Sequence, residues 1–258
     1  MLTSRLMINK RGATLDASER SRIEDAISEV RDLAPRSTVV RPGVELNHST
    51  ILVSGILSRY IDDRKGLRQL VAIHFPGDFV DLHAFPLKVL DHGIEAISSA
   101  VVACVPHSEL CAMTSEFPGL ARKFWTSTLI DAAIHRAWLF RLGRLDAMGR
   151  IAHFLSETNV RLGAIGLSNG KEFRLDLTQT DIAEISGLTN VHVNRVMRQL
   201  REEGLCVFRS SKVEIIDPGK LARRGQFNPG YLKIDTSPLS ALEPHEMAIN
   251  ALALEHPK

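Results

Sequence analysis

Residues 177–205 read LTQTDIAEISGLTNVHVNRVMRQLREEGL, and they are the most informative segment of the chain. Thr178 is placed to cap a short helix over 179–186, and Gly187 supplies the backbone freedom that a tight turn needs. Thr189 can cap a second helix, on which apolar residues recur at every third or fourth position. Two helices joined by a short turn with a glycine are typical of a helix-turn-helix motif.

The outer face of the second helix has the chemistry of a DNA-reading surface. Three arginines and no acidic residue occur from Thr189 to Arg201. Guanidinium and amide groups can read base edges in the major groove, and cations can contact phosphates. The predicted DNA-binding residues are Thr178, Gln179, Thr189, Asn190, Val191, His192, Asn194, Arg195 and Arg198, followed by Arg209, Ser210 and Lys212.

The segment after this helix predicts a wing. Residues 205–208 and 213–216 are apolar runs of strand type, and the polar turn Arg-Ser-Ser-Lys at 209–212 separates them. A two-stranded wing brings Arg209 and Lys212 to its tip, where they can meet phosphates. The alternative is a helical hairpin with a solvated basic face, and the wing favours DNA binding over it.

The N-terminal half shows a different periodicity. Short β-branched runs separated by turn residues cover 38–40, 51–53, 56–61, 70–75 and 101–105. Short strands at such close spacing predict an antiparallel sandwich or roll. Residues 1–20 are polar and poorly patterned, so a flexible arm is expected there. Apolar residues at helical spacing predict a helix from Ser21 to Leu33.

A long amphipathic helix is predicted over residues 120–145, which contain no proline. At 1.5 Å per residue it would extend about 38 Å. So long a helix needs a partner along its length, and a second copy of the chain is the simplest one. The predicted dimer interface consists of Phe124, Ile130, Ile134 and Trp138. The alternative is a helix packed wholly on its own domain.

The composition is that of an ordinary globular chain. Of 258 residues, 44% are hydrophobic and 24% charged, and 32 Lys+Arg against 30 Asp+Glu give a net charge of +2. These values exclude a disordered chain but not a local basic face. The sequence lacks an apolar run of ~18 residues and a secretory signal, so a cytoplasmic location with no membrane contact is expected. Three scattered cysteines argue against a disulfide framework.

Taken together, these motifs resemble the Crp/Fnr family of bacterial transcription regulators over nearly all of residues 35–220. In the N-terminal half the resemblance rests on Pro42-Gly43, on a strand ending at Gly55, on the charged hairpin 62–66 and on Pro76-Gly77-Asp78-Phe79. In the C-terminal half it rests on the hinge-like junction 145–152, on Gly187, and on Arg195 at the position of the family's principal base-reading arginine.

The resemblance implies an α+β fold with an N-terminal antiparallel β-roll of the cyclic-nucleotide-binding type, a long dimerisation helix and a C-terminal winged helix-turn-helix. The expected boundaries are a flexible arm at 1–20, the sensor β-roll at 21–117, the dimerisation helix at 118–146, the winged helix-turn-helix at 147–220 and a C-terminal extension at 221–258. Within that extension, residues 236–258 are expected to be a mobile tail.

The implied function is a homodimeric, sequence-specific transcription regulator with its recognition helix, 189–201, in the major groove at an inverted-repeat operator. The implied partners are double-stranded DNA, a second copy of the chain, RNA polymerase and a small-molecule effector. Asn190 and Val191 replace the Arg and Glu of family members that read with an Arg-Glu-x-x-x-Arg motif. The half-site should therefore differ from that of the cyclic-AMP receptor.

The effector pocket departs further from the family pattern. Cyclic-nucleotide binders have a Glu after the Gly-Asp-Phe turn and an Arg-Ser pair further on. This chain has Asp81 at the first place, and no arginine lies between Gly77 and Arg122. A cyclic phosphate is poorly held without a guanidinium. We therefore expect an effector other than cyclic AMP, in a pocket formed by Asp81, His83, Lys88 and His92.

Two alternative functions stay open: a β-roll sensor or interaction module whose helix-turn-helix makes protein contacts, and a haem-type gas sensor that also binds DNA. The spacings of His74, His83, His92 and His107 fit no standard metal site, so no metal or cofactor is expected. No catalytic residues are expected either. Ser108 lies next to His107 and Glu109 but lacks a nucleophile elbow, which argues against an enzyme.

Overall fold

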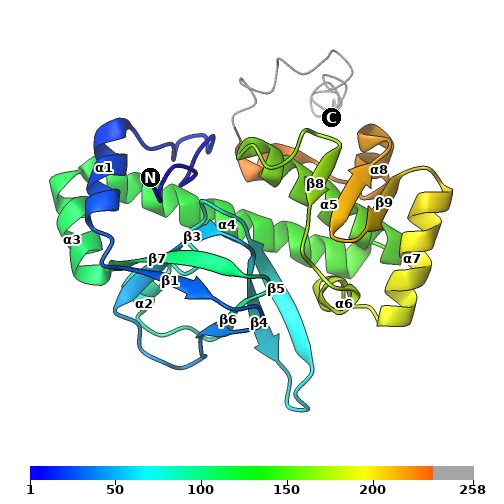
Figure 1. The fold of residues 1–258 in the computed structure, drawn as a ribbon, viewed down its shortest axis with the longest axis horizontal. Coiled ribbons are helices and arrows are strands. Elements are labelled where there is room, and N and C mark those ends of the chain that lie inside the picture. Colours follow the sequence, from blue (N-terminus) through cyan, green and yellow to red (C-terminus); the bar gives the residue numbers. More distant parts are fainter. Residues whose placement is uncertain (235–258) are drawn as a thin grey trace, which may run out of the picture. The chain divides into compact units, whose positions relative to one another are not determined.

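The computed structural model describes residues 1–234 of the chain. They form two compact units, one from Met1 to His135 and one from Arg136 onward. The division falls inside the long helix α4 (Pro118–Arg144), not at the expected junction near residue 146 (Figure 1). Within residues 1–234, no helix combines the length and the apolar character that crossing a membrane requires.

The first unit contains the predicted antiparallel roll, built from two sheets. One sheet has the order β1 (Glu29–Leu33), β7 (Ala100–Pro106), β3 (His48–Ser54). The other has the order β2 (Thr38–Val40), β6 (Gly93–Ala96), β4 (Leu57–Asp62), β5 (Arg68–His74). A shared core of Leu52, Leu57, Ile94 and Val102 packs between them. On the other face of β3 and β7, Ile51, Ala103 and Val105 belong to a second buried cluster, so these two strands are covered on both faces and alternate little in polarity.

Strand β1 corrects one sequence prediction. Val30 and Leu33 fit a helical spacing, but the helix α1 (Ala17–Asp25) ends before them. The chain then extends and pairs with β7, where Glu29 lies opposite Cys104. Helix α1 also begins before the predicted start at Ser21, because Asp16 caps it by accepting the Glu19 N–H. Sheet pairing has overridden a local periodicity.

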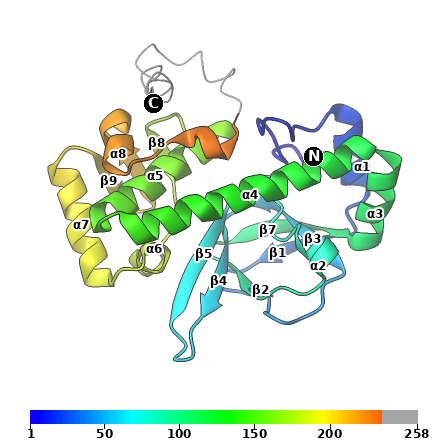
Figure 2. The same cartoon turned by 180° about the vertical axis from the view of Figure 1, so that it is seen from behind.

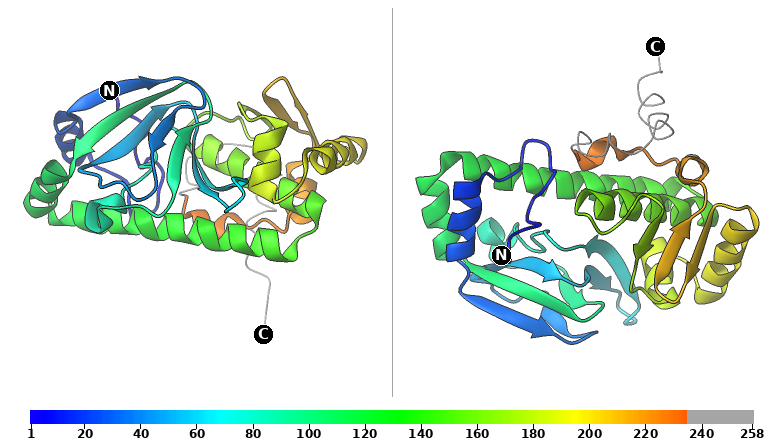
Figure 3. Two further views of the ribbon diagram at one scale, coloured as in Figure 1. Left: turned by 90° about the horizontal axis from the view of Figure 1, so that it is seen from below. Right: turned by 45° about the horizontal axis from the view of Figure 1, so that its top comes forward.

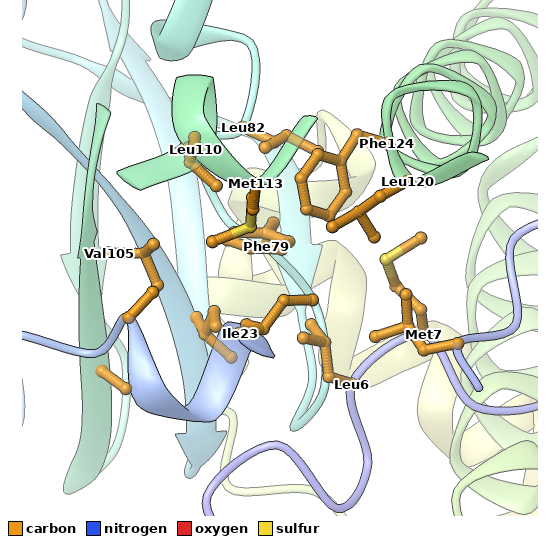
Figure 4. Close-up of a cluster of buried hydrophobic side chains, with 14 of the residues drawn as sticks. Leu6, Met7, Ile23, Phe79, Leu82, Val105, Leu110, Met113, Leu120 and Phe124 are labelled. Atoms are coloured by element: carbon orange, nitrogen blue, oxygen red, sulfur yellow. The ribbon is translucent and has the colours of Figure 1, made fainter. Parts of the chain in front are cut away.

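The N-terminal residues are packed, contrary to the expected flexible arm. Leu6 and Met7 are fully buried in a cluster with Ile23, Leu120 and Phe124 (Figure 4). The backbone also approaches the Pro-Gly-Asp turn closely, since a Cβ on Gly77 would lie 2.1 Å from the Arg5 carbonyl oxygen. A small number of apolar side chains can hold a polar segment in place when each of them is buried in the core.

Two further helices complete the first unit: the short α2 (Ala84–Leu87) and α3 (His107–Glu116). Helices α1 and α3 lie side by side (Figure 3). The Arg22 guanidinium joins them, at 2.9 Å from Glu109 and 3.1 Å from Glu116. Neither α2 nor α3 was predicted from the sequence.

The second unit contains the predicted helix-turn-helix and wing. After α5 (Ala147–Ala164) come β8 (Glu172–Arg174), α6 (Gln179–Ser186), α7 (Asn190–Glu202), β9 (Cys206–Arg209) and β10 (Lys212–Ile215). The wing sheet has the order β8-β10-β9, so it has a third strand that was not predicted. Helix α8 (Pro218–Arg224) and a 3-10 helix, η1 (Pro229–Leu232), follow. The predicted mobile tail, 236–258, lies outside the described residues.

Helix α4 confirms the predicted long helix, which is 27 residues long and continuous (Figure 2). The predicted dimer-interface residues, however, are wrong. Phe124, Ile130 and Trp138 are buried within the chain itself, and Ile134 is half-buried. Helical periodicity identifies an apolar stripe on α4 but not what covers it. The stripe predicted as the dimer interface lies in the interior of the protomer.

The packed N-terminus leads to a stability prediction. Replacing Leu6 by Ala should lower the free energy of unfolding by about 2–5 kcal/mol, because it leaves a cavity in the cluster. Urea denaturation followed by circular dichroism measures this change. The exposed Arg11→Ala is the control and should stay within about 0.5 kcal/mol of the parent protein. Equal midpoints for Leu6→Ala and Arg11→Ala would show that the N-terminal residues are a loose arm after all.

Candidate nucleic-acid interface

The helix-turn-helix is fixed at both helix starts by its own side chains. The Thr178 hydroxyl accepts the Asp181 N–H, and the Asp181 carboxylate accepts the Thr178 N–H at 2.6 Å, which forms a capping box. Thr189 caps α7 by accepting the His192 N–H at 3.3 Å. Between the helices, Gly187 has φ +61°, in the left-handed region that favours glycine. The predicted turn and both predicted caps are thus confirmed.

Two arginines hold the end of α6 and therefore the turn. The Arg141 guanidinium, from α4, donates to the Ile185 carbonyl at 2.9 Å. Arg150, from α5, donates to the Ser186 carbonyl at 3.1 Å. Helix C-termini leave carbonyls without intrahelical donors, and cations there are stabilising. Neither arginine was predicted from the sequence, although an arginine inside an apolar helical stripe, as at position 141, is a signal for a buried contact.

Helix α7 separates a buried side from an exposed side. The predicted apolar stripe consists of Val193, Val196, Met197 and Leu200; Met197 is half-buried and the other three are buried. The opposite side is polar and basic, except for Val191, which is 81% exposed. Among the predicted DNA-binding residues only His192 is half-buried; the exposed ones are Thr178, Gln179, Thr189, Asn190, Val191, Asn194, Arg195, Arg198, Arg209, Ser210 and Lys212. An exposed basic helix face of this kind can enter a major groove.

Side-chain contacts on this face orient some of these groups. The Arg195 guanidinium donates to His192 Nε2 at 2.8 Å, which leaves most of its N–H donors open to a ligand. The Asn190 amide donates to the Thr180 hydroxyl at 3.2 Å and so joins the start of α7 to α6. Arg198 lies 3.9 Å from Glu202, but both are exposed, so this pair contributes little.

The wing tip is a tight two-residue turn. Ser210 and Ser211 have φ of +50° and +61°, as in the type I′ turns that join hairpin strands. Arg209 and Lys212 lie opposite each other at the base of this turn. Lys212 Nζ is 2.8 Å from Glu172 of β8, and this contact raises the pKa of the lysine. The missed strand β8 therefore brings an acidic partner to a predicted phosphate contact.

Comparison with known proteins now identifies the family. Residues 149–224 match the Crp-like helix-turn-helix domain. Electron transport regulator A of Shewanella oneidensis is 24% identical over 208 residues, covering 81% of this chain and 83% of that protein. The fumarate and nitrate reduction regulatory protein of Vibrio cholerae is 23% identical over 208 residues, with the same two coverages. The structure of FixK2 from Bradyrhizobium japonicum superposes with a TM-score of 0.69 at 25% identity, covering 76% of this chain and 96% of that one.

The chain carries a Crp-like helix-turn-helix domain and is similar to Crp/Fnr regulators over about four fifths of its length. It is accordingly a DNA-binding transcription regulator, since that is the role of the Crp/Fnr proteins, and not an enzyme. The predicted α+β fold, with its roll, long helix and winged helix-turn-helix, is that of the Crp/Fnr structures.

The four residues predicted to form the effector pocket of this Crp/Fnr regulator have separate surroundings. Asp81 is fully buried and accepts the Thr50 N–H at 2.5 Å, and burial raises its pKa to about 6. His83 stacks on His92, with 5.2 Å between ring centroids, and burial lowers the pKa of both imidazoles. Lys88 Nζ instead lies 3.3 Å from His107 Nδ1, and it lines a cavity of about 500 Å³. The structure does not support one pocket built from all four.

A buried ion pair in the same unit was missed. The guanidinium of Arg59, from β4, lies 2.6 Å from the Asp131 carboxylate of α4, and it also donates to the Val80 carbonyl. Burial opposes ionisation of Asp131, but the charge and hydrogen bond of Arg59, together with the neighbouring His74 and His135, outweigh it and hold the pKa of this carboxyl well below its usual range. Within residues 1–234, no three His, Cys, Asp or Glu side chains are arranged to hold a metal ion.

The turn of the helix-turn-helix provides a matched pair of glycine substitutions. Gly187→Ala should destabilise the protein by about 1–2 kcal/mol, because its cost is the left-handed backbone. A Cβ there would meet side-chain atoms only at 3.7 Å or more, so steric overlap adds little. Gly163→Ala, in helix α5 with open space around the added methyl group, should instead stabilise by about 0.5–1 kcal/mol. Thermal unfolding shows whether each variant is more or less stable than the parent protein. A change of the unfolding temperature in the same direction for both variants would contradict the assigned turn.

Proposed function

We propose that this regulator acts as a homodimer that reads an inverted-repeat operator, with α7 of each protomer in a major groove. The observation that carries the proposal is the exposed basic face of α7, with the Arg195 guanidinium held by His192. Two such helices related by a two-fold axis favour half-sites about one helical turn apart, ~34–36 Å. RNA polymerase and an effector other than cyclic AMP stay predicted partners.

The roles of individual residues follow from their exposure and chemistry. Arg195 would read a guanine through its N7 and O6 atoms. Val191 projects an apolar side chain from the first turn of α7, which suits contact with a thymine methyl group. Asn190 and Asn194 would contact an adenine or a phosphate. Phosphate contacts would come from the helix starts at Thr178, Gln179 and Thr189, from Arg198, and from the wing at Arg209, Ser210 and Lys212.

A second apolar face of α4 supports the dimer. Trp125 and Leu139 are 67% and 74% exposed, and Leu129 and Phe140 are also exposed. At 100° per residue these four side chains fall within an arc of about 100°, on the side of the helix opposite the buried stripe. Burying each of them would contribute about 1.5–3 kcal/mol. Pairing with the same face of a second copy is the arrangement that two-fold symmetry allows.

Base reading and phosphate contact are predicted to respond differently to substitution. Arg195→Ala should cost about 1–3 kcal/mol per half-site on the cognate operator and relax discrimination at one base pair, since a bidentate guanine contact is lost. Lys212→Ala should weaken binding to every sequence and make the salt dependence shallower, since a phosphate contact is lost. Both variants are measured on an operator selected from random DNA and on a scrambled duplex, at two salt concentrations. Equal, sequence-independent losses would refute base reading by Arg195.

The dimer face is predicted to respond to charge. Leu129→Asp combined with Leu139→Asp should give folded monomers in sedimentation, because both side chains are exposed within one protomer. Ile130→Asp is the matched control on the same helix. It should unfold the protein, because it places a charge in the buried core. Persistence of the dimer in the double variant at micromolar concentration would place the interface elsewhere.

A further inference from the structure

The segment after α8 is fitted tightly against α5, although it lies beyond the residues that match the Crp-like domain. A Cβ on Gly225 would lie 2.4 Å from the His153 backbone nitrogen, so only glycine fits this approach. His153 Nδ1–H donates to the Gly225 carbonyl at 2.9 Å. The His153 ring also stacks on Tyr231 and meets the edge of Phe227. The chain from 225 to 232 is therefore built into the DNA-binding unit.

Tyr231 connects this segment to a buried carboxylate. Its hydroxyl donates to Glu157 Oε2 at 2.5 Å, and Glu157 is 1% exposed. The Trp138 indole N–H donates to the same carboxylate, at 3.1 and 3.2 Å from its two oxygens. Burial and the neighbouring Glu157 charge raise the pKa of the Tyr231 hydroxyl far above its ordinary value, so it remains a hydrogen-bond donor.

The same group of side chains encloses Arg141, the arginine that holds the end of α6. Its guanidinium is fully buried, 4.2 Å from the Trp138 ring and 5.5 Å from the Phe154 ring. Burial lowers the pKa of Arg141 to about 10, and the Glu157 charge opposes this shift. Arg141 Nε and Nη1 have no hydrogen-bond partner among the described residues. Its placement therefore depends on the Ile185 carbonyl, the ring faces and the nearby carboxylate.

We propose that Tyr231 is a positioning residue for DNA recognition. Through Glu157 and Trp138 it fixes Arg141, and Arg141 fixes the Ile185 carbonyl at the end of α6. The turn at Gly187 follows directly, so the chain of contacts sets the angle at which α7 leaves α6. Recognition geometry tolerates errors of only about 0.5 Å, which makes a single hydrogen bond behind the motif matter. The proposal rests on base reading by α7, as proposed above.

The test uses the full chain and the conservative variant Tyr231→Phe, which keeps the ring and removes the hydroxyl, with its hydrogen bond to Glu157 and its 3.2 Å contact with His153 Nε2. The chain has two tyrosines, so Tyr60→Phe, in β4 of the other unit, is the matched control. Affinity is measured on the selected operator and on a scrambled duplex. Tyr231→Phe should weaken operator binding about three- to tenfold and leave binding to the scrambled duplex unchanged. Tyr60→Phe should change neither.

Two further readouts separate positioning from simple loss of stability. In the nitrogen-15 spectrum, Tyr231→Phe should shift the indole N–H signal of Trp138, assigned with Trp138→Phe, and leave that of Trp125 in place. In a double-mutant cycle with Arg141→Met, the effect of Tyr231→Phe on operator affinity should largely disappear, because both act through the same contact chain.

Additive losses in the cycle, equal losses on both duplexes, or unchanged operator affinity would each overturn the proposal. Arg195→Ala on the same two duplexes judges the proposed function separately, because it removes a base contact and leaves Trp138 and its neighbours intact.

Discussion

Helix α4 has apolar side chains on two opposite faces, and the rest of the structure depends on how both are covered. One face, with Phe124, Ile130 and Trp138, is buried by the chain's own residues. The other, with Trp125 and Leu139, is left exposed in the single protomer. A helix with a single apolar stripe could bury all of its apolar side chains within its own chain. The second stripe carries a free-energy cost in water that grows with its area, and a second copy of the helix can remove that cost.

Within each unit, a buried arginine joins that unit's part of α4 to the rest of the same unit. In the first unit Arg59 reaches Asp131 of the helix, and in the second Arg141 of the helix reaches the Ile185 carbonyl. Taking a guanidinium out of water costs several kcal/mol, and the contacts restore this only in a good geometry. Alternative packings of α4 would leave an arginine buried without its acceptor. These contacts therefore contribute more to the choice of one arrangement than to net stability.

The sequence predicted the elements whose signals are local. Helix α6 and the caps at Thr178 and Thr189 follow from a threonine before each helix and a glycine between them, and those signals need nothing from elsewhere in the chain. The misses all involve distant partners. Val30 and Leu33 fit a helix until β7 pairs with them, and the face of α4 that is buried depends on the whole core.

In the candidate site, too, the features with local signals could be predicted from the sequence, and the contacts with distant residues could not. Exposed polar residues on α7 follow from helical periodicity, because each position's side of the helix is fixed by its number. Glu172, Arg141 and Tyr231 come from outside the motif and act on it through contacts across 40 residues or more, namely Lys212 with Glu172, Arg141 with Ile185 and Tyr231 with Glu157. A local pattern can indicate that Arg141 is buried, but it does not identify the distant residue that each of these side chains contacts.

Contacts within the protein change how much positive charge α7 and the wing can offer to DNA. Arg195 uses one of its five N–H donors on His192, a hydrogen bond that orients the guanidinium, and four donors remain for a base. Lys212 is paired with Glu172, so a phosphate has to share the ammonium with a carboxylate that it repels. The wing therefore attracts DNA less than its lysine and arginine alone indicate, while the recognition helix keeps the full effect of Arg195. The balance favours sequence-dependent binding by α7 over non-specific attraction by the wing.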